Sequence, residues 1–247
     1  MTMKIMMLLL TINFFNTHIM KAEFSKDTFD TGDGELTISF IGHGTLMFEY
    51  HDMVIHIDPT MREADYASMP DADLILITHH HGDHLDPTAI HLVVKADCPV
   101  VMTKSCLEQL GDLKGAVIMQ NGDRRTIKGI TIEAIPAYNI EHKRPDGQPF
   151  HPKGMGNAYL LSIGKLKVLI GGDTENVPEI KALKGIDVAF LPMNLPYTMT
   201  PEMVADVARA MRPKILYPYH YGDTDPQALV DLLKDEKNIE VRIRELK

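Results

Sequence analysis

The sequence of 247 residues has few cysteines, few basic residues and no flexible linker. Its two cysteines, Cys98 and Cys106, form no CxxC pair, so a disulfide framework is excluded and both are expected to be buried apolar residues. Lysine and arginine number 25 against 34 acidic residues, which gives a formal net charge of -9. Such a surface without basic runs argues against wrapping a nucleic-acid backbone. No linker rich in Gly, Ser and Pro divides the chain and no repeat of about 20 to 50 residues is visible, so one domain is expected.

The remaining composition is that of a soluble globular protein. Apolar residues make up 45% of the chain and charged residues 24%, a balance that allows a full hydrophobic core. Histidine is unusual, because the chain contains 12 of them and three are consecutive at residues 79–81. This clustering directs the search for function toward metal chemistry.

The N-terminal segment predicts export. Residues 1–22 contain Lys4, an apolar run at 5–15 and no acidic residue, a pattern that resembles a secretory signal peptide. The run is too short for a stable membrane span. We therefore expect a signal peptide at 1–22, one folded domain at 23–247 and an exported, periplasmic protein. The alternative is a cytoplasmic protein whose start has been assigned too far upstream.

The order of predicted elements indicates an α/β sandwich. Strands are expected at residues 36–41, 46–50, 53–57, 74–78, 100–103, 116–119, 130–135, 158–163, 166–170, 187–191, 214–217 and 239–243, and helices at 87–95, 105–110, 201–211 and 226–233. Asp86 is the expected N-cap of the first helix, with Pro87 at its first position. Each half runs from a strand meander into strand-helix alternation. Two β-sheets packed on each other, with helices on the outer faces, account for this order.

The sharpest pattern is THHHGDH at residues 78–84, directly after a continuous apolar strand. Ligands are held rigidly where a strand ends. Imidazole nitrogens and carboxylate oxygens are ligand types that Zn²⁺ and neighbouring metals prefer, and a short loop can present two pairs of them to two adjacent ions. The spacing HxHxDH therefore predicts that one ion binds His79 and His81 and a second ion binds Asp83 and His84.

Further ligands are expected later in the chain, because two for each ion are too few. Asp173, in the segment GGDT, follows the predicted strand 166–170 and is the natural carboxylate to bridge both ions. His220, in the segment PYHYG, supplies the third imidazole of the second ion. For the first ion the candidates are His142 and His151. We prefer His151, because its segment leads directly into the strand that pairs with the one before Asp173.

These residues together resemble the metallo-β-lactamase superfamily, whose four-layer αββα sandwich matches the predicted strand order. The resemblance covers about residues 35–247. The segments IGHGT at 41–45 and HIDP at 56–59 are similar to the ascorbate-6-phosphate lactonase-like branch of metal-dependent hydrolases. The resemblance implies that one metal is bound by His79, His81 and His151, that the other is bound by Asp83, His84 and His220, and that Asp173 bridges them. The chain departs from the common pattern in one place: many members carry the third His in a Gly-His turn, whereas here PAYN at 136–139 precedes a loop.

Four other polar residues have a functional and a plain structural interpretation. Asp58 is a candidate acceptor for the outer N–H of a metal-bound histidine, which would fix the tautomer of that ring; a simple strand-end turn is the alternative. His43, in a glycine-flanked turn, is a candidate catalytic residue at the rim of the site. His56 is expected to be structural, and His80 to point away from the metals.

The long loop at 141–147 is the segment most expected to touch substrate. Lys143, Arg144 and Lys153 lie in or near it and could hold an anionic substrate, although solvated loop charges are the commoner interpretation of such residues.

The predicted function is a binuclear metal-dependent hydrolase. Its cofactors would be two divalent ions, zinc in the first place and manganese or iron as alternatives. A metal-bridging hydroxide, oriented by Asp83, would attack a small ester, lactone or phosphodiester, with His43 or Lys153 assisting. No GxSxG nucleophile motif is present. The alternative is a non-catalytic metal-binding or interaction module that retains the fold.

Overall fold

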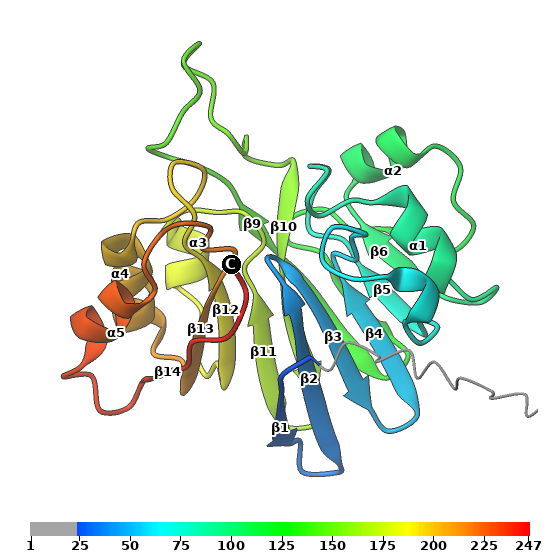
Figure 1. Ribbon diagram of the computed structural model, residues 1–247, viewed down its shortest axis with the longest axis horizontal. Coiled ribbons are helices and arrows are strands. Elements are labelled where there is room, and N and C mark those ends of the chain that lie inside the picture. The colour runs from blue at the N-terminus through cyan, green and yellow to red at the C-terminus, as the bar shows by residue number, and fades with distance from the viewer. Residues whose placement is uncertain (1–23) are drawn as a thin grey trace, which may run out of the picture.

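The computed structural model describes residues 24–247, so the predicted signal peptide at 1–22 lies outside the described part of the chain. Two seven-stranded β-sheets face each other at the centre. Figure 1 shows α1 and α2 on the outer face of one sheet and α3, α4 and α5 on the outer face of the other. The predicted four-layer αββα sandwich is therefore confirmed.

The two sheets have the same plan, in which antiparallel strands continue into parallel ones. The first contains β1 (Lys26–Asp30), β2 (Glu35–Gly42), β3 (Thr45–Tyr50), β4 (Met53–Ile57), β5 (Leu74–Leu76), β6 (Val100–Met102) and β7 (Ala116–Ile118). The second contains β8 (Arg124–Ile127), β9 (Ile130–Ala137), β10 (Gly156–Ile163), β11 (Leu166–Ile170), β12 (Val188–Pro192), β13 (Ile215–Tyr219) and β14 (Glu240–Val241). Pairing is parallel from β4 to β7 and from β11 to β14. The carboxyl ends of the parallel strands in each sheet therefore lie along one edge.

The helices are α1 (Pro87–Val93), α2 (Lys104–Leu110), α3 (Pro178–Lys181), α4 (Pro201–Met211) and α5 (Gln227–Leu233), with a short 3₁₀ helix η1 (Tyr66–Ser68). Asp86 caps α1 as predicted, because its side chain accepts hydrogen bonds from the backbone N–H groups of Thr88 and Ala89. Within residues 24–247, no helix is both long enough and apolar enough to cross a bilayer.

Two apolar clusters hold the layers together. The larger one fills the space between the sheets and continues under α4 and α5. The smaller one lies between the first sheet and the helices α1 and α2. Cys98 and Cys106 are free and buried in this smaller cluster, as predicted, and burial raises the pKa of each thiol to about 11. The helices on both outer faces thus pack against the strands whose ends carry the predicted metal ligands.

Several elements differ from the sequence-based expectation. The strands β1 and β8 and the short helix α3 were not predicted, and β14 is shorter than the expected 239–243. Both unpredicted strands lie at sheet edges and have largely exposed, polar sequences, KDTFD and RRTI. They therefore lack the apolar alternation by which a half-buried strand is recognised.

Candidate metal centre

The candidate site lies where loops from both sheets meet. The segment THHHGDH follows β5, the GGDT segment follows β11, and His220 follows β13 directly. His151 comes from the long connection between β9 and β10, which projects above the sandwich in Figure 1. All seven residues predicted as metal ligands are brought together, although they come from four separate stretches of the chain.

The first group of ligand atoms consists of three imidazoles and one carboxylate oxygen. Nε2 of His79 and Nε2 of His151 each lie 3.1 Å from Nδ1 of His81. Oδ2 of Asp173 lies 3.1 Å from Nε2 of His151 and 3.8 Å from Nε2 of His79. Four atoms at about 3.3 Å from each other are what a tetrahedral zinc site with bonds of about 2.0–2.1 Å requires. These residues form a cluster able to bind a metal ion.

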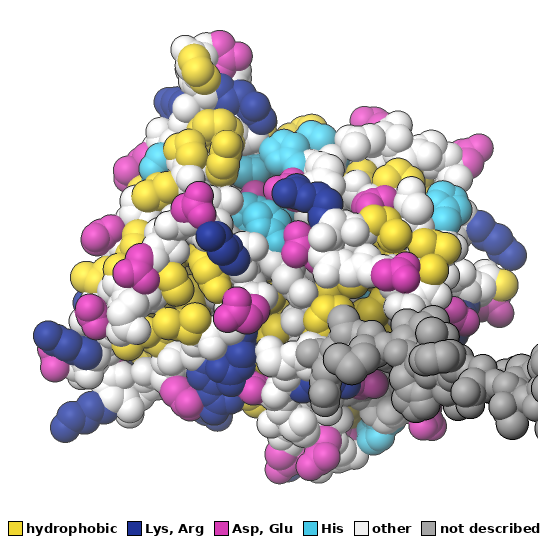
Figure 2. Space-filling view, in the orientation of Figure 1, with side chains coloured by type: hydrophobic (Ala, Val, Ile, Leu, Met, Phe, Trp, Pro, Cys, Tyr) yellow, Lys and Arg dark blue, Asp and Glu magenta, His cyan; other side chains and the backbone are white. Residues whose placement is uncertain are grey.

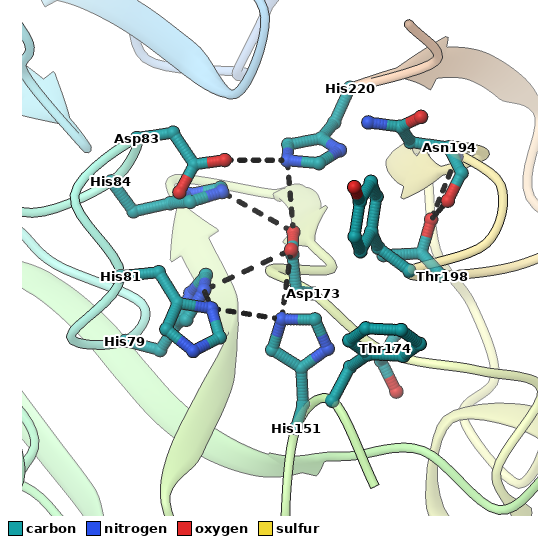
Figure 3. Close-up of polar contacts among 12 residues, drawn as sticks. His79, His81, Asp83, His84, His151, Asp173, Thr174, Asn194, Thr198 and His220 are labelled. Atoms are coloured by element: carbon teal, nitrogen blue, oxygen red, sulfur yellow. Dashed lines mark hydrogen bonds and ion pairs between the residues drawn. The ribbon is translucent and has the colours of Figure 1, made fainter. Parts of the chain in front are cut away.

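The second group contains Asp83, His84 and His220. Nε2 of His220 lies 3.5 Å from Oδ2 of Asp83 and 3.6 Å from Oδ1 of Asp173. Nε2 of His84 lies 3.3 Å from the same Oδ1 of Asp173. In Figure 3, Asp173 therefore stands between the two groups, with one carboxylate oxygen directed to each. This is the arrangement expected of a bridging carboxylate.

One buried carboxylate fixes the orientation of two histidines. Oδ2 of Asp58 lies 2.7 Å from Nδ1 of His84 and accepts the hydroxyl hydrogen of Thr78 at 2.6 Å. Because this hydroxyl has only one hydrogen, its oxygen accepts the Nδ1–H of His79, at 3.1 Å. Asp58 thereby leaves the Nε2 lone pairs of His79 and His84 facing the site. The predicted orienting role of Asp58 agrees with this geometry.

A second network orients His151. Oδ1 of Asn139 accepts from the backbone N–H of His151 and lies 2.7 Å from its Nδ1. The amide nitrogen of Asn139 donates to Glu175, which is fully buried. Glu175 also accepts from three consecutive backbone N–H groups, those of residues 140 to 142, and so fixes the start of the long loop.

The same carboxylate accounts for His142, the alternative third ligand. Nδ1 of His142 lies 2.7 Å from Oε1 of Glu175, so His142 belongs to the network that holds the loop. The structure brings His151, and not His142, into the first group.

The electrostatics of the centre favour bound cations. His84 Nε2, His220 Nε2 and Asp173 Oδ1 are buried and, within residues 24–247, have no hydrogen-bond partner. Burial raises the pKa of Asp173, but attraction to His220 and other nearby histidines outweighs it, so the pKa lies well below its usual range. Burial lowers the pKa of His81 to about 4. Ionised carboxylates and neutral imidazoles are the forms that bind metal ions, so the residues present fit the predicted cofactor.

His84 responds differently to the same surroundings. Burial lowers its pKa, but the carboxylates of Asp173 and Asp58 have a larger combined effect and raise the pKa well above its usual value. The negative charge around this ring therefore favours a positive charge at this position, whether a proton or a metal ion.

His43 lies against the second group. Its Nε2 is 3.3 Å from Oδ2 of Asp83, and its ring centroid is 3.8 Å from that of His220. Its backbone φ is 48°, a left-handed value also found at His220 (48°) and Asp58 (45°). Left-handed non-glycine residues are uncommon and cluster at functional sites. The structure thus places His43 at the rim, as predicted, within reach of Asp83.

Of the remaining predicted polar residues, His56 and Lys153 do not line the cavity above the two groups of ligand atoms, whereas Arg144 does. His56 is fully buried in β4 with Nε2 3.0 Å from the carbonyl oxygen of Pro70, which is a structural role. Lys153 is paired with Glu179 at 2.7 Å and is not part of the cavity lining over the metal groups. Arg144 does line that cavity.

This cavity has a volume of about 480 Å³ and opens directly over both groups. Figure 2 shows the histidine side chains gathered at the surface between the two halves of the molecule. The lining residues are His43, Arg62, His81, Gly82, Asp83, Arg144, Phe150, His151, Asp173, Asn194, Tyr197 and His220.

Sequence reasoning missed Asn139, Glu175 and Arg62. Asn139 and Glu175 are 36 residues apart and act only because the loop after β9 folds onto the loop after β11. Arg62 lies in the connection after β4, where a charged residue normally suggests a solvated loop. A search for polar residues that follow strands on the metal-bearing edge would have identified all three as candidates.

Comparison with known proteins agrees with this geometry. The family described as a β-lactamase superfamily domain matches residues 37–220. This chain belongs to the metallo-β-lactamase superfamily. A crystal structure of a proposed metal-dependent hydrolase from Parabacteroides distasonis is 49% identical, covers 91% of this chain and 100% of its own, and superposes with a TM-score of 0.86.

Two less similar proteins also match this chain, one in sequence and one in fold. A UPF0173 metal-dependent hydrolase from Thermococcus kodakarensis is 29% identical over 77% of this chain and 87% of its own length. A metallo hydrolase from Ignicoccus hospitalis is 21% identical, with a TM-score of 0.68 over 85% of this chain and 95% of its own. The prediction of a metal-dependent hydrolase of this superfamily is confirmed. These names state no substrate.

Proposed function

We propose that this metal-dependent hydrolase holds two divalent cations, zinc in the first place, and cleaves a small ester, lactone or phosphodiester. The proposal rests on the position of Asp173 between the two groups. One of its carboxylate oxygens lies 3.1 Å from His151 in the first group, and the other lies 3.3 Å from His84 in the second. A structural zinc site is closed by four protein ligands. Seven shared ligands for two ions would leave positions open to water and substrate.

The residues of the two groups have distinct tasks in this proposal. His79, His81 and His151 would hold one cation, Asp83, His84 and His220 would hold the other, and Asp173 would be shared by both groups. When bound, such a pair supplies a water of lowered pKa and a Lewis acid that stabilises the negative charge developing on the attacked carbonyl or phosphoryl group. The partly exposed carboxylate of Asp83 faces the cavity, where it can accept a hydrogen bond from the attacking water.

His43 assists from the rim. Its Nε2, 3.3 Å from Asp83, can donate to that carboxylate and keep it directed toward the water, or donate to the departing group as the bond breaks. Its other ring nitrogen lies 3.1 Å from the backbone oxygen of Lys247.

The experiment combines metal analysis with a matched variant. Protein truncated before Glu23 is loaded with zinc, manganese or iron and analysed for metal content and for hydrolysis of generic lactones, esters and phosphodiesters. We expect about two ions per chain and activity that a chelator abolishes. Asp83→Asn should lose about 10²-fold or more in kcat while retaining metal at the first group.

Two results would contradict the proposal. One is metal content well below two together with no hydrolysis of any substrate class, which would favour the non-catalytic module. The other is unchanged turnover of Asp83→Asn on a verified substrate.

Export is a separate proposal, which rests on the composition of residues 1–22 alone. Its test is N-terminal sequencing of the protein recovered from fractionated cells. A periplasmic protein that begins after residue 22 would support it, and a cytoplasmic protein with an intact N-terminus would contradict it.

A further inference from the structure

Apart from the two groups that could hold metal ions, the charged residues that line the cavity are positive. Among residues 24–247, the only carboxylates in its lining are Asp83 and Asp173, and both belong to the groups that could hold a metal ion. The other two charged residues of the lining are arginines, Arg62 and Arg144. The cavity therefore carries two positive charges besides those of the cations it is proposed to hold.

These arginines are not neutralised by the protein. Within residues 24–247, neither forms an ion pair with a carboxylate, whereas Lys153 of the same loop region is held by Glu179 at 2.7 Å. In the described part of the chain, the guanidinium of Arg144 has one hydrogen bond, a long one of 3.5 Å from Nη2 to the carbonyl oxygen of Phe150. A guanidinium with free N–H groups at the wall of a cavity is suited to a carboxylate or phosphate, which it can bind through two parallel hydrogen bonds.

The two arginines come from different halves of the sandwich. Arg62 lies in the connection between β4 and η1, on the first sheet, and Arg144 lies in the connection between β9 and β10, on the second. Figure 2 shows basic side chains beside the histidines on this face. A ligand in the cavity is therefore flanked by positive charge from both halves.

The position of Arg144 is supported by aromatic packing. Its guanidinium lies 5.2 Å from the ring centroid of Phe150, and this ring packs edge-on against Tyr197 at 5.1 Å. Both aromatic residues line the cavity. The cavity thus combines an anion-binding group with an apolar wall next to it.

We propose that Arg62 and Arg144 form an anion clamp, and that the substrate carries a carboxylate or phosphate separate from the bond that is cleaved. The clamp deepens the proposed function. Its role in the reaction rests on that function, whereas the binding of an anion to the two arginines does not. The clamp binds the remote charge, the wall formed by Phe150 and Tyr197 receives the apolar part, and the reacting group lies over the two metal groups.

The test uses two esters that differ only at the remote end. The probes are mono-4-nitrophenyl adipate, which ends in a carboxylate, and 4-nitrophenyl hexanoate, which ends in a methyl group. The adipate chain is long enough that its carboxylate does not cleave its own ester. The zinc-loaded protein should prefer the adipate in kcat/KM. In Arg62→Gln/Arg144→Gln this preference should fall by about tenfold or more. The matched control is Lys143→Gln, which removes an exposed charge next to Arg144 that is not in the lining, and it should retain the preference.

Binding is measured separately from turnover. Calorimetric titration with phenylphosphonate should show affinity about tenfold lower or more in the double variant than in the wild type and in Lys143→Gln. An unchanged ester preference or an unchanged phosphonate affinity in a double variant that melts like the wild type overturns the clamp. Arginine-dependent binding without hydrolysis of either ester supports the clamp and counts against the hydrolytic reaction. The two proposals can therefore fail independently.

Discussion

Nδ1 of His151 donates its hydrogen to Oδ1 of Asn139 across 2.7 Å. The direction of this bond is fixed, because the amide nitrogen of Asn139 already donates to Glu175 and to the carbonyl oxygen of Tyr197. The lone pair of His151 must therefore be on Nε2, the atom that lies 3.1 Å from both His81 and Asp173. Asn139 thus selects the tautomer that a metal ligand needs.

Replacing Asn139 should weaken metal binding without removing any ligand. In Asn139→Ala, the ring of His151 loses its acceptor and is free to rotate or change tautomer. Loss of such an orienting partner typically lowers metal affinity about 10- to 100-fold. Competition with a chelator measures the metal affinity of each site. The site that contains His151 should lose more affinity than the other.

The control for Asn139 is His142→Ala, which removes the rejected ligand candidate. His142 contacts Glu175 and not the metal groups, so we expect no loss of metal stoichiometry in this variant. Loss of an ion from His142→Ala together with normal affinity in Asn139→Ala would show that the third ligand has been assigned to the wrong histidine.

Asp58 should matter to both metal groups at once. Both carboxylate oxygens of Asp58 accept hydrogen bonds, which come from Thr78 and His84. In Asp58→Asn an amide NH₂ replaces one of these oxygens, so that its N–H groups face the hydrogen-bond donors of these residues. His79 and His84 belong to different groups, and both depend on this carboxylate for their tautomers. We expect metal affinity to fall about 10- to 100-fold at each site, measured by the same chelator competition.

A surface carboxylate provides the comparison for Asp58. Asp73→Asn disrupts a partly exposed pair with Lys95 at 2.9 Å, at the end of β5 opposite to the one that the THHHGDH segment follows, and should bind both ions normally. If Asp58→Asn retained wild-type affinity at either site, the orienting role of Asp58 toward that group would be disproved.

Local pattern was enough to predict the fold and the residues that gather in the two groups of the candidate metal centre. The predicted metal ligands in the THHHGDH and GGDT segments and at position 220 follow within a few residues the predicted strands that became β5, β11 and β13. Topology then carries the ligands to one place, because parallel strands present their carboxyl ends at a common edge. This is why Asp173 and His220 could be assigned from the sequence although they are 47 residues apart.

Contacts between loops could not be predicted in the same way. The bond between Asn139 and Glu175 depends on how two irregular connections pack, and neither segment has a periodicity that fixes its path. The same holds for Lys153, for which the sequence left open a substrate contact or a solvated loop position, and which is held by Glu179 on α3, a helix of only four residues. Charge alone did not distinguish Lys153 from Arg144.

His56 should make stability fall in mild acid. It is fully buried, and burial lowers its pKa to about 4, with the hydrogen bond to Pro70 opposing only part of the shift. In the unfolded chain the pKa is about 6.5. Between pH 6.5 and 4 the unfolded chain therefore binds a proton that the folded protein does not, which lowers the free energy of unfolding by up to about 3 kcal/mol.

Urea unfolding of His56→Gln and of the wild type, both in chelator, isolates this contribution. The glutamine side chain can still donate to the carbonyl oxygen of Pro70 but does not titrate. The difference in unfolding free energy between the two proteins should therefore shrink, or change in favour of the variant, as the pH falls from 7 to 4.5. A difference independent of pH would mean that His56 is protonated equally in the folded and unfolded states.

Removing metal should destabilise the folded protein, because it leaves lone pairs and carboxylate oxygens facing each other in a buried centre. Asp173 is only 5% exposed, and its oxygens face four imidazole nitrogens at 3.1 to 3.8 Å. An ion that binds only the folded state stabilises it by about 2.7 kcal/mol when its free concentration is 100 times Kd. Thermal unfolding with and without chelator should therefore show a clear fall in Tm on metal removal. Asp173→Asn, which lacks the shared carboxylate, should show a much smaller difference, and an equal Tm for the wild type in both conditions would mean that the centre does not hold its ions through the folded arrangement of these side chains.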